Sequence, residues 1–167
     1  MPLLKGGMIV ADDWVRIDED ADIANETAVV VSLERWLSEA DTLRGRNAPV
    51  AVAIGNHQSP SQIVEDLETI DAVFLTFPAY TDGRAYSQAR LLRQRYGYKG
   101  EIRATGNVLR DQYAFMQRCG FDAFEVADDA DPAGWDKSTD AMSASYQTAA
   151  DGAQAIWAKR HGMPSSV

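Results

Sequence analysis

The chain has 167 residues, of which 46% are hydrophobic and 25% charged, and 25 acidic against 16 basic side chains give a net charge of −9. These values are typical of a single soluble globular domain, exclude collagen-like, disordered and disulfide-scaffold chains, and leave too little chain for a complete βα barrel of roughly 200 to 250 residues. The acidic balance argues against nucleic-acid binding, because phosphate recognition depends on an excess of lysine and arginine.

Residues 1–26 are predicted to form an N-terminal arm or hairpin, because they are acidic and irregular. Within this arm, residues 12–17 alternate in polarity and indicate one short strand, and a run of charges follows over residues 18–22. The first ten residues lack the pattern of a signal peptide, and no stretch of the chain approaches about 18 uninterrupted apolar residues. We therefore expect a cytoplasmic protein without a membrane-spanning segment.

From residue 27 onward, short apolar runs alternate with segments whose apolar side chains recur at helical spacing. This alternation predicts one α/β domain of repeated βα units over residues 27–160, with a mostly parallel sheet of about five strands, and a C-terminal tail over residues 161–167. The predicted strands cover residues 28–31, 50–54, 72–77, 101–104 and 121–126. The predicted helices begin near residues 33, 60, 84 and 108, and a further long or broken helix covers residues 137–159.

The last two predicted strands carry charges on one face, as Glu101 and Arg103 of the fourth strand illustrate. That face must be exposed to water, paired with other charges, or part of a site, because an isolated buried charge is costly. Two architectures satisfy this requirement: an open doubly wound sheet with these strands at an edge, or an incomplete βα barrel with a polar inner face. We favour the open sheet and keep the partial barrel as the alternative.

The sequence gives few signals for a cofactor. Cys119 is the only cysteine, so the chain can form no internal disulfide and cannot by itself supply four thiolates for an iron–sulfur cluster. Neither a dinucleotide-binding glycine fingerprint nor a P-loop occurs, and the aspartates of residues 128–136 lack the spacing of a calcium loop. We expect no cofactor and no metal, with a flavin as the alternative, because residues 104–107 are similar to the phosphate loop of flavodoxins.

Ligands of parallel α/β proteins bind beyond the carboxyl ends of the strands, so the polar residues after each predicted strand form the candidate site. Guanidinium groups, a histidine and free backbone N–H groups can together hold a small oxyanion. A cation at a helix start opposes the helix dipole, so the charge of Arg84 must be offset by an anionic ligand or by Asp82. The candidate anion-binding residues are Arg84, Arg103, His57, Asn107, Asp82, Gly83 and Gly106.

Other polar residues receive structural interpretations. Arg90, Arg93 and Arg95 share a predicted helix and are expected to form a solvated charged face. Cys119 precedes a glycine at a helix end and is expected to be a small buried apolar residue. The order of the elements places Cys119 at the edge of the sheet opposite His57, so we reject a Cys-His nucleophile.

Two runs of the sequence resemble a bacterial family known as domain of unknown function 934. They are Phe77 to Arg93, which reads FPAYTDGRAYSQARLLR, and Gly97 to Gln112, which reads GYKGEIRATGNVLRDQ. The similarity continues through residues 118–122 and 145–147, so it covers most of the chain from about residue 28. Members of that family are described as oxidoreductases of sulfite reduction, and their genes commonly accompany those of sulfite reductase and the sulfonucleotide reductase.

The resemblance implies a pathway, assimilatory sulfate reduction, rather than a demonstrated reaction, and two functions fit it. The first is an accessory protein without its own redox centre that docks on sulfite reductase or its electron donor, because an acidic chain is steered to basic faces. The second is a small enzyme that binds sulfite or a sulfonucleotide through Arg84, Arg103 and His57. We favour the accessory protein, and expect neither nucleic acid nor a membrane as its partner.

Overall fold

The computed structural model describes residues 1–23, 26–128, 131 and 134–135, and the expected helix over 137–159 and the tail lie outside them. The strands are β1 (Leu3–Lys5), β2 (Met8–Val10), β3 (Val15–Arg16), β4 (Val29–Ser32), β5 (Val50–Ile54), β6 (Ala72–Phe77), β7 (Glu101–Gly106) and β8 (Ala123–Glu125). The helical elements are α1 (Leu33–Arg44), η1 (Pro60–Asp66), α2 (Arg84–Arg90), η2 (Leu91–Arg95), η3 (Arg110–Gln112) and α3 (Tyr113–Cys119).

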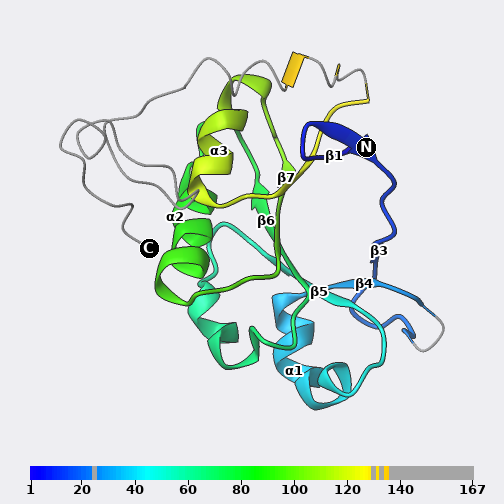
Figure 1. Ribbon diagram of the computed structural model, residues 1–167. Coiled ribbons are helices and arrows are strands. Elements are labelled where there is room, and N and C mark those ends of the chain that lie inside the picture. The colour runs from blue at the N-terminus through cyan, green and yellow to red at the C-terminus, as the bar shows by residue number, and fades with distance from the viewer. Residues whose placement is uncertain (24–25, 129–130, 132–133, 136–167) are drawn as a thin grey trace.

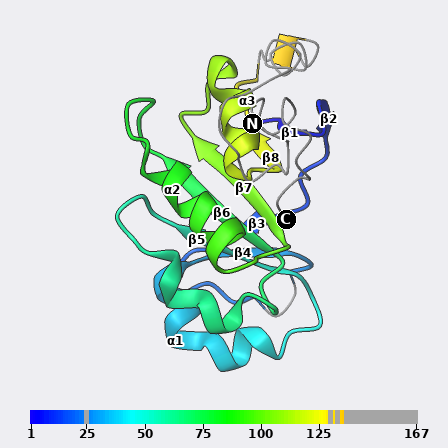
Figure 2. The same cartoon turned by 60° about the vertical axis from the view of Figure 1, so that its left-hand side comes forward.

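One eight-stranded sheet organises the fold, in the order β2-β1-β8-β7-β6-β5-β4-β3 (Figure 1). The five predicted strands are confirmed as β4 to β8, which are mutually parallel neighbours in chain order. The preference for a doubly wound sheet is wrong, because that fold needs a reversal of strand order and helices on both faces. Here the order never reverses and the sheet curls into a half-barrel, so the partial barrel is the better description (Figure 2).

The N-terminal arm explains the curl of the sheet. Its first hairpin, β1 and β2, joins one edge through antiparallel pairing of β1 with β8, and β3 joins the opposite edge beside β4. Eight strands at about 4.8 Å spacing would span roughly 33 Å in a flat sheet, whereas the five residue steps from Val10 to Val15 reach at most about 18 Å. The two edges must therefore approach each other, which a flat sheet would not allow.

The outer face of the sheet packs under the helices and forms the main core. Its side chains alternate with those of the inner face, and Val31, Val52 and Leu75 belong to the same apolar cluster as Trp36 of α1. Trp36 is fully buried, and its indole N–H donates to a carboxylate oxygen of Asp66 at 2.8 Å. Ser32 caps the start of helix α1, because its hydroxyl accepts from the Arg35 amide at 3.0 Å.

Candidate functional site

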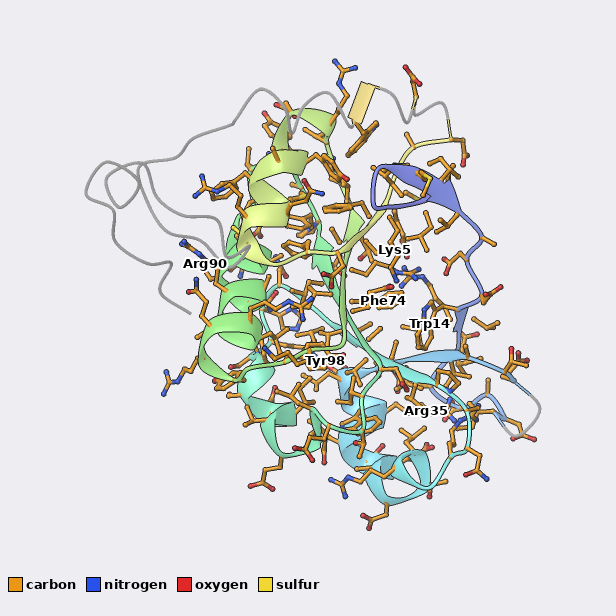
Figure 3. The ribbon with its side chains drawn as sticks, viewed as in Figure 1. Lys5, Trp14, Arg35, Phe74, Arg90 and Tyr98 are labelled. Carbon is orange, nitrogen blue, oxygen red and sulfur yellow. The ribbon has the colours of Figure 1, made fainter. Side chains whose placement is uncertain are left out.

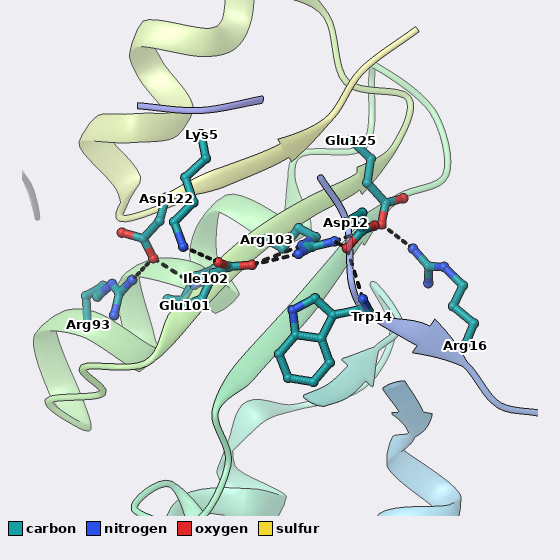
Figure 4. A network of polar contacts seen from close by, with 10 residues as sticks. All are labelled: Lys5, Asp12, Trp14, Arg16, Arg93, Glu101, Ile102, Arg103, Asp122 and Glu125. Carbon is teal, nitrogen blue, oxygen red and sulfur yellow. Dashed lines mark hydrogen bonds and ion pairs between the residues drawn. The ribbon is translucent and has the colours of Figure 1, made fainter. Parts of the chain in front are cut away.

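The inner face of the sheet carries a buried guanidinium, that of Arg103, with an exposed fraction of 1%. Arg103 lies in β7 opposite Phe74 of β6, and its guanidinium carbon stands 4.4 Å from the centre of the Phe74 ring. Its Nε donates to Glu101 at 3.0 Å and its Nη1 donates to Asp12 at 2.8 Å, while Glu125 lies 3.9 Å away (Figure 4). Three carboxylates thus surround one cation, as a buried charge requires.

Two further cations complete this network. Lys5 of β1 donates to the second oxygen of Glu101 at 2.7 Å, and Arg16 of β3 donates to Glu125 at 2.5 Å. Together with Arg103 and Asp12, these residues give three positive and three negative charges, so the network is neutral as a whole. The charged face expected from the sequence is therefore a paired face. Its partners come from the N-terminal arm, about 90 to 110 residues away in the chain.

Residues 11–16, here called the strap, cross the inner face between the two edges of the sheet. Trp14 packs edge-on against Phe74 with ring centres 6.0 Å apart, and joins the small inner cluster of Phe74, Val30 and Ala51. Figure 3 shows Trp14, Phe74 and Lys5 gathered on one side of the sheet, away from Arg90 on α2. The strap is one chain thick, so it covers Arg103 while its own outer side faces water.

The structure corrects the expected position of Arg103. The sequence interpretation included it in the predicted strand 101–104 but also counted it among the candidate site residues at the carboxyl ends of the strands. Strand β7 instead continues to Gly106, so Arg103 lies inside the strand and points to the inner face. Alternating polarity could not fix the end of this strand, because Arg103 and Thr105 are polar residues that the fold buries.

A second polar cluster lies at the carboxyl ends of β5 and β6. Arg84 donates from Nε and Nη2 to the two oxygens of Asp82, at 3.0 and 2.6 Å, and Asn56 donates to the same carboxylate at 2.5 Å. The Arg84 hydrogen bonds hold the pKa of Asp82 well below its usual value. Asp82 therefore offsets the charge of Arg84 at the start of α2, which is one of the two possibilities that the sequence left open.

In the part of the chain that the structure describes, His57, Gly106 and Asn107 form no hydrogen bond or ion pair with Asp82 or Arg84. The side chains of His57 and Asn107 are exposed, and the Asn107 amide donates to the Phe77 carbonyl at 2.8 Å. Gly106 has a φ of +84°, and a Cβ there would collide with the Phe77 carbonyl oxygen, so this turn requires glycine. Across the residues that the structure describes, no hydrogen bond or ion pair joins Arg84 to Arg103 or to His57.

One buried polar side chain, that of Gln88, was not expected from the sequence. Gln88 of α2 was not singled out, yet its buried side-chain amide donates to the carbonyls of Gly55 and Gln58, both at 2.8 Å. It thereby holds the loop after β5. The signal that could have identified Gln88 in the sequence was a polar residue at a buried position of the helix.

Arg93 does not belong to the solvated helix face that was expected for it. Its Nη1 donates to the carbonyls of Tyr98 and Gly100 at 2.8 Å, its Nε donates to the Gly120 carbonyl at 3.0 Å, and it pairs with Asp122. The expectation is wrong for Arg93 because Tyr98 and Gly100, just after the helix, and Gly120, 27 residues away, direct their carbonyl oxygens at its guanidinium. Sequence spacing on the helix carries no information about those carbonyl oxygens.

The remaining structural expectations concern Cys119, metals and membranes. Cys119 is buried, as the sequence predicted. Within residues 1–23 and 26–128 and the three described residues beyond them, no group of three or more histidine, cysteine or acidic side chains is placed to hold a metal ion. The same part of the chain contains no helix that is both long enough and apolar enough to cross a bilayer.

Comparison with known proteins identifies one family. No curated protein matches the chain. The sequence profile of a family described as "Bacterial protein of unknown function (DUF934)" matches residues 51–157, which is nearly two thirds of the chain and includes strands β5 to β8. The match contains both the Asp82–Arg84 cluster and Arg103, in agreement with the resemblance seen in the sequence. The chain therefore belongs to the bacterial DUF934 family.

Proposed function

We propose that this chain is an accessory protein of assimilatory sulfite reduction, which docks on sulfite reductase or on the protein that supplies its electrons. The pathway is the one that the family resemblance implies. The observation that carries the proposal is the uneven distribution of charge. Residues 1–26 contain seven acidic and two basic side chains, so about a sixth of the chain holds −5 of the net charge of −9.

The position of this charge supports docking. Asp13, Asp18, Glu19 and Asp20 are exposed, and they lie in the arm on or beside the strap. An acidic surface of this kind speeds the encounter with a basic partner and fixes its orientation, and salt weakens both effects. Transient electron-transfer encounters bury only small interfaces, so a short acidic arm is large enough to serve as such a surface.

The alternative is a small enzyme that binds sulfite or a sulfonucleotide as an oxyanion. Its two arginines would have to be available, but Arg84 is paired with Asp82 and Arg103 with Asp12 and Glu101. An incoming anion would have to displace a carboxylate in either place. This competition within the protein favours the accessory function over the enzyme.

The proposal is tested by measuring the affinity of the full chain for purified sulfite reductase, with and without its electron donor, at low and high salt. We expect binding at low salt that weakens steeply as the Debye length falls from about 30 Å to about 3 Å. The double variant Asp13→Asn, Glu19→Gln should bind more weakly. The matched control is Glu65→Gln, Glu68→Gln, which removes two exposed charges on the helical side and should leave the affinity unchanged.

Three results would contradict the accessory function. They are the absence of binding at low salt, binding that salt does not change, and equal losses in the two double variants. Calorimetric binding of sulfite that Arg84→Ala abolishes in a folded protein would instead support the enzyme.

A further inference from the structure

Strand β2 forms one margin of the sheet, and no described strand pairs with its outer side. Its three residues, Met8, Ile9 and Val10, are all apolar and all exposed, with exposed fractions of 66%, 42% and 36%. Figure 2 shows this strand at the periphery of the molecule, beyond β1 and away from α1. An apolar strand in this position is uncommon, because unpaired edges are sites of strand addition.

The turn before β2 determines which backbone groups face outward. Gly6 and Gly7 both have positive φ, 57° and 78°, and form a two-residue hairpin turn between Lys5 and Met8. In such a hairpin the residues that flank the turn exchange hydrogen bonds with each other, and the next pair does not. Ile9, opposite Leu4, is in that next pair, so its N–H and C=O point to the open edge.

Apart from its length of only three residues, β2 lacks the common means of protecting an edge. It contains no lysine, no proline and no inward-pointing charge, and it is paired on its inner side along all three residues. The opposite edge differs, because β3 has only two residues and Arg16 places a charge there. The two margins of one sheet are thus unequal: β3 has one exposed valine, Val15, beside Arg16, whereas all three residues of β2 are exposed and apolar.

The surrounding charge selects the kind of chain that can bind. Asp12 and the exposed Asp13 follow β2 after one alanine, and they belong to an arm with a net charge of −5 whose other acidic residues, 18–20, 22 and 26, lie beyond β3 at the opposite margin. Two copies that met edge to edge would bring two such arms together and repel each other. A basic segment would be attracted, and its apolar side chains would cover Met8 and Val10.

We propose that β2 accepts, as an added strand, an extended segment of a partner protein in which apolar residues alternate with lysine or arginine. Backbone hydrogen bonds to Ile9 fix the position of the added strand, and the acidic arm supplies the attraction. The identification of that partner with the sulfite-reduction proteins rests on the proposed function, whereas the surface itself rests on β2.

The test uses the full-length chain, two variants and two kinds of probe. Ile9→Pro removes the outward N–H without removing a β1–β2 hydrogen bond, and Ile9→Lys protects the edge by a charge that repels a basic segment. The control is Leu37→Lys on α1, a residue with a similar exposed fraction of 48% on the helical side. The probes are purified sulfite reductase with its electron donor, an octapeptide of alternating lysine and valine, and a matching glutamate–valine peptide.

We expect the lysine–valine peptide to bind and the glutamate–valine peptide not to bind. Both Ile9 variants should weaken binding by about tenfold or more, whereas Leu37→Lys should not change it. Binding of the basic peptide without binding of the enzyme would support the surface and contradict the proposed function. Binding of the enzyme that both Ile9 variants retain would contradict the surface and leave the function in place.

Two other outcomes would also overturn the proposal. Failure of both the enzyme and the basic peptide to bind would contradict the surface and the function together. A dimer of the chain that Ile9→Pro dissociates, seen by sedimentation without any partner, would assign the edge to a second copy instead.

Discussion

The two sides of the sheet are covered in very different ways. On the outer side, helices bury a large apolar core around residues such as Trp36 and Phe77. On the inner side, a strap one chain thick covers a small apolar cluster and a neutral network of six charges around Arg103. Apolar burial is strong and non-directional, whereas ion pairs are geometrically specific and contribute less net stability. The outer side therefore stabilises the fold, and the inner side positions the arm.

The largest loss of stability should follow a substitution in the core on the outer side. Trp36→Ala removes a fully buried indole and leaves Asp66 without one of its donors, so we expect a loss of about 3 to 5 kcal/mol in the free energy of unfolding. Urea denaturation followed by circular dichroism measures this loss. A loss smaller than that of an inner-side variant would contradict the claim that the outer side stabilises the fold.

Removal of the cation at the centre of the inner network should cause the second largest loss of stability. Arg103→Met keeps the length of the side chain but leaves Glu101, Asp12 and Glu125 without their shared cation. We expect a loss of about 2 to 3 kcal/mol, less than for fully buried pairs because Asp12 is 30% exposed. The same urea titration serves here, and a stability equal to that of the wild type would show that the network does not stabilise the fold.

A smaller effect, confined to the strap, should follow Asp12→Asn. The variant retains a hydrogen-bond acceptor but removes the ion pair with Arg103, so we expect about 1 kcal/mol and faster amide exchange over residues 12–16. Exchange in α1 should be unchanged. Faster exchange throughout the protein would mean that the strap and the helical side unfold as one unit.

The smallest effect concerns the exposed Asp82–Arg84 pair. The pKa of Asp82 is lowered from 3.8 by the Arg84 hydrogen bonds, so its ionised form is favoured in the folded state. The pair therefore stabilises the fold fully above pH 3.8, and this contribution disappears as the pH falls below that value. Asp82→Asn should be slightly less stable than the wild type near neutral pH, and the difference should vanish in acid. A stability difference between the two proteins that grows as the pH falls would contradict this prediction.

The sequence predicted local elements well because they depend on local signals. The short apolar runs became β4 to β8, and helix α1 begins at residue 33 as its helical spacing indicated. The curl of the sheet was kept only as the alternative, because it depends on the pairing of β1 with β8 and of β3 with β4. Such pairing joins the two ends of the sheet, and no local periodicity records it.

The candidate site was predicted only in pieces for the same reason. Asp82 and Arg84 are two residues apart, so their pairing was within reach of the sequence. The hydrogen-bond partners of Arg103 are Asp12, 91 residues away, and Glu101 on the same strand. The charges on the strand face required water, paired charges or a site, and this requirement did not indicate that the arm supplies the partners.

Amide hydrogen exchange of the full chain, alone and with sulfite reductase and its electron donor, tests the central claim most directly. The claim is that the acidic arm is the docking surface. We expect exchange to slow over residues 8–16 in the complex, while the loops 55–58 and 79–84 exchange as in the free protein. Slower exchange in those loops, with no change in the arm, would contradict it.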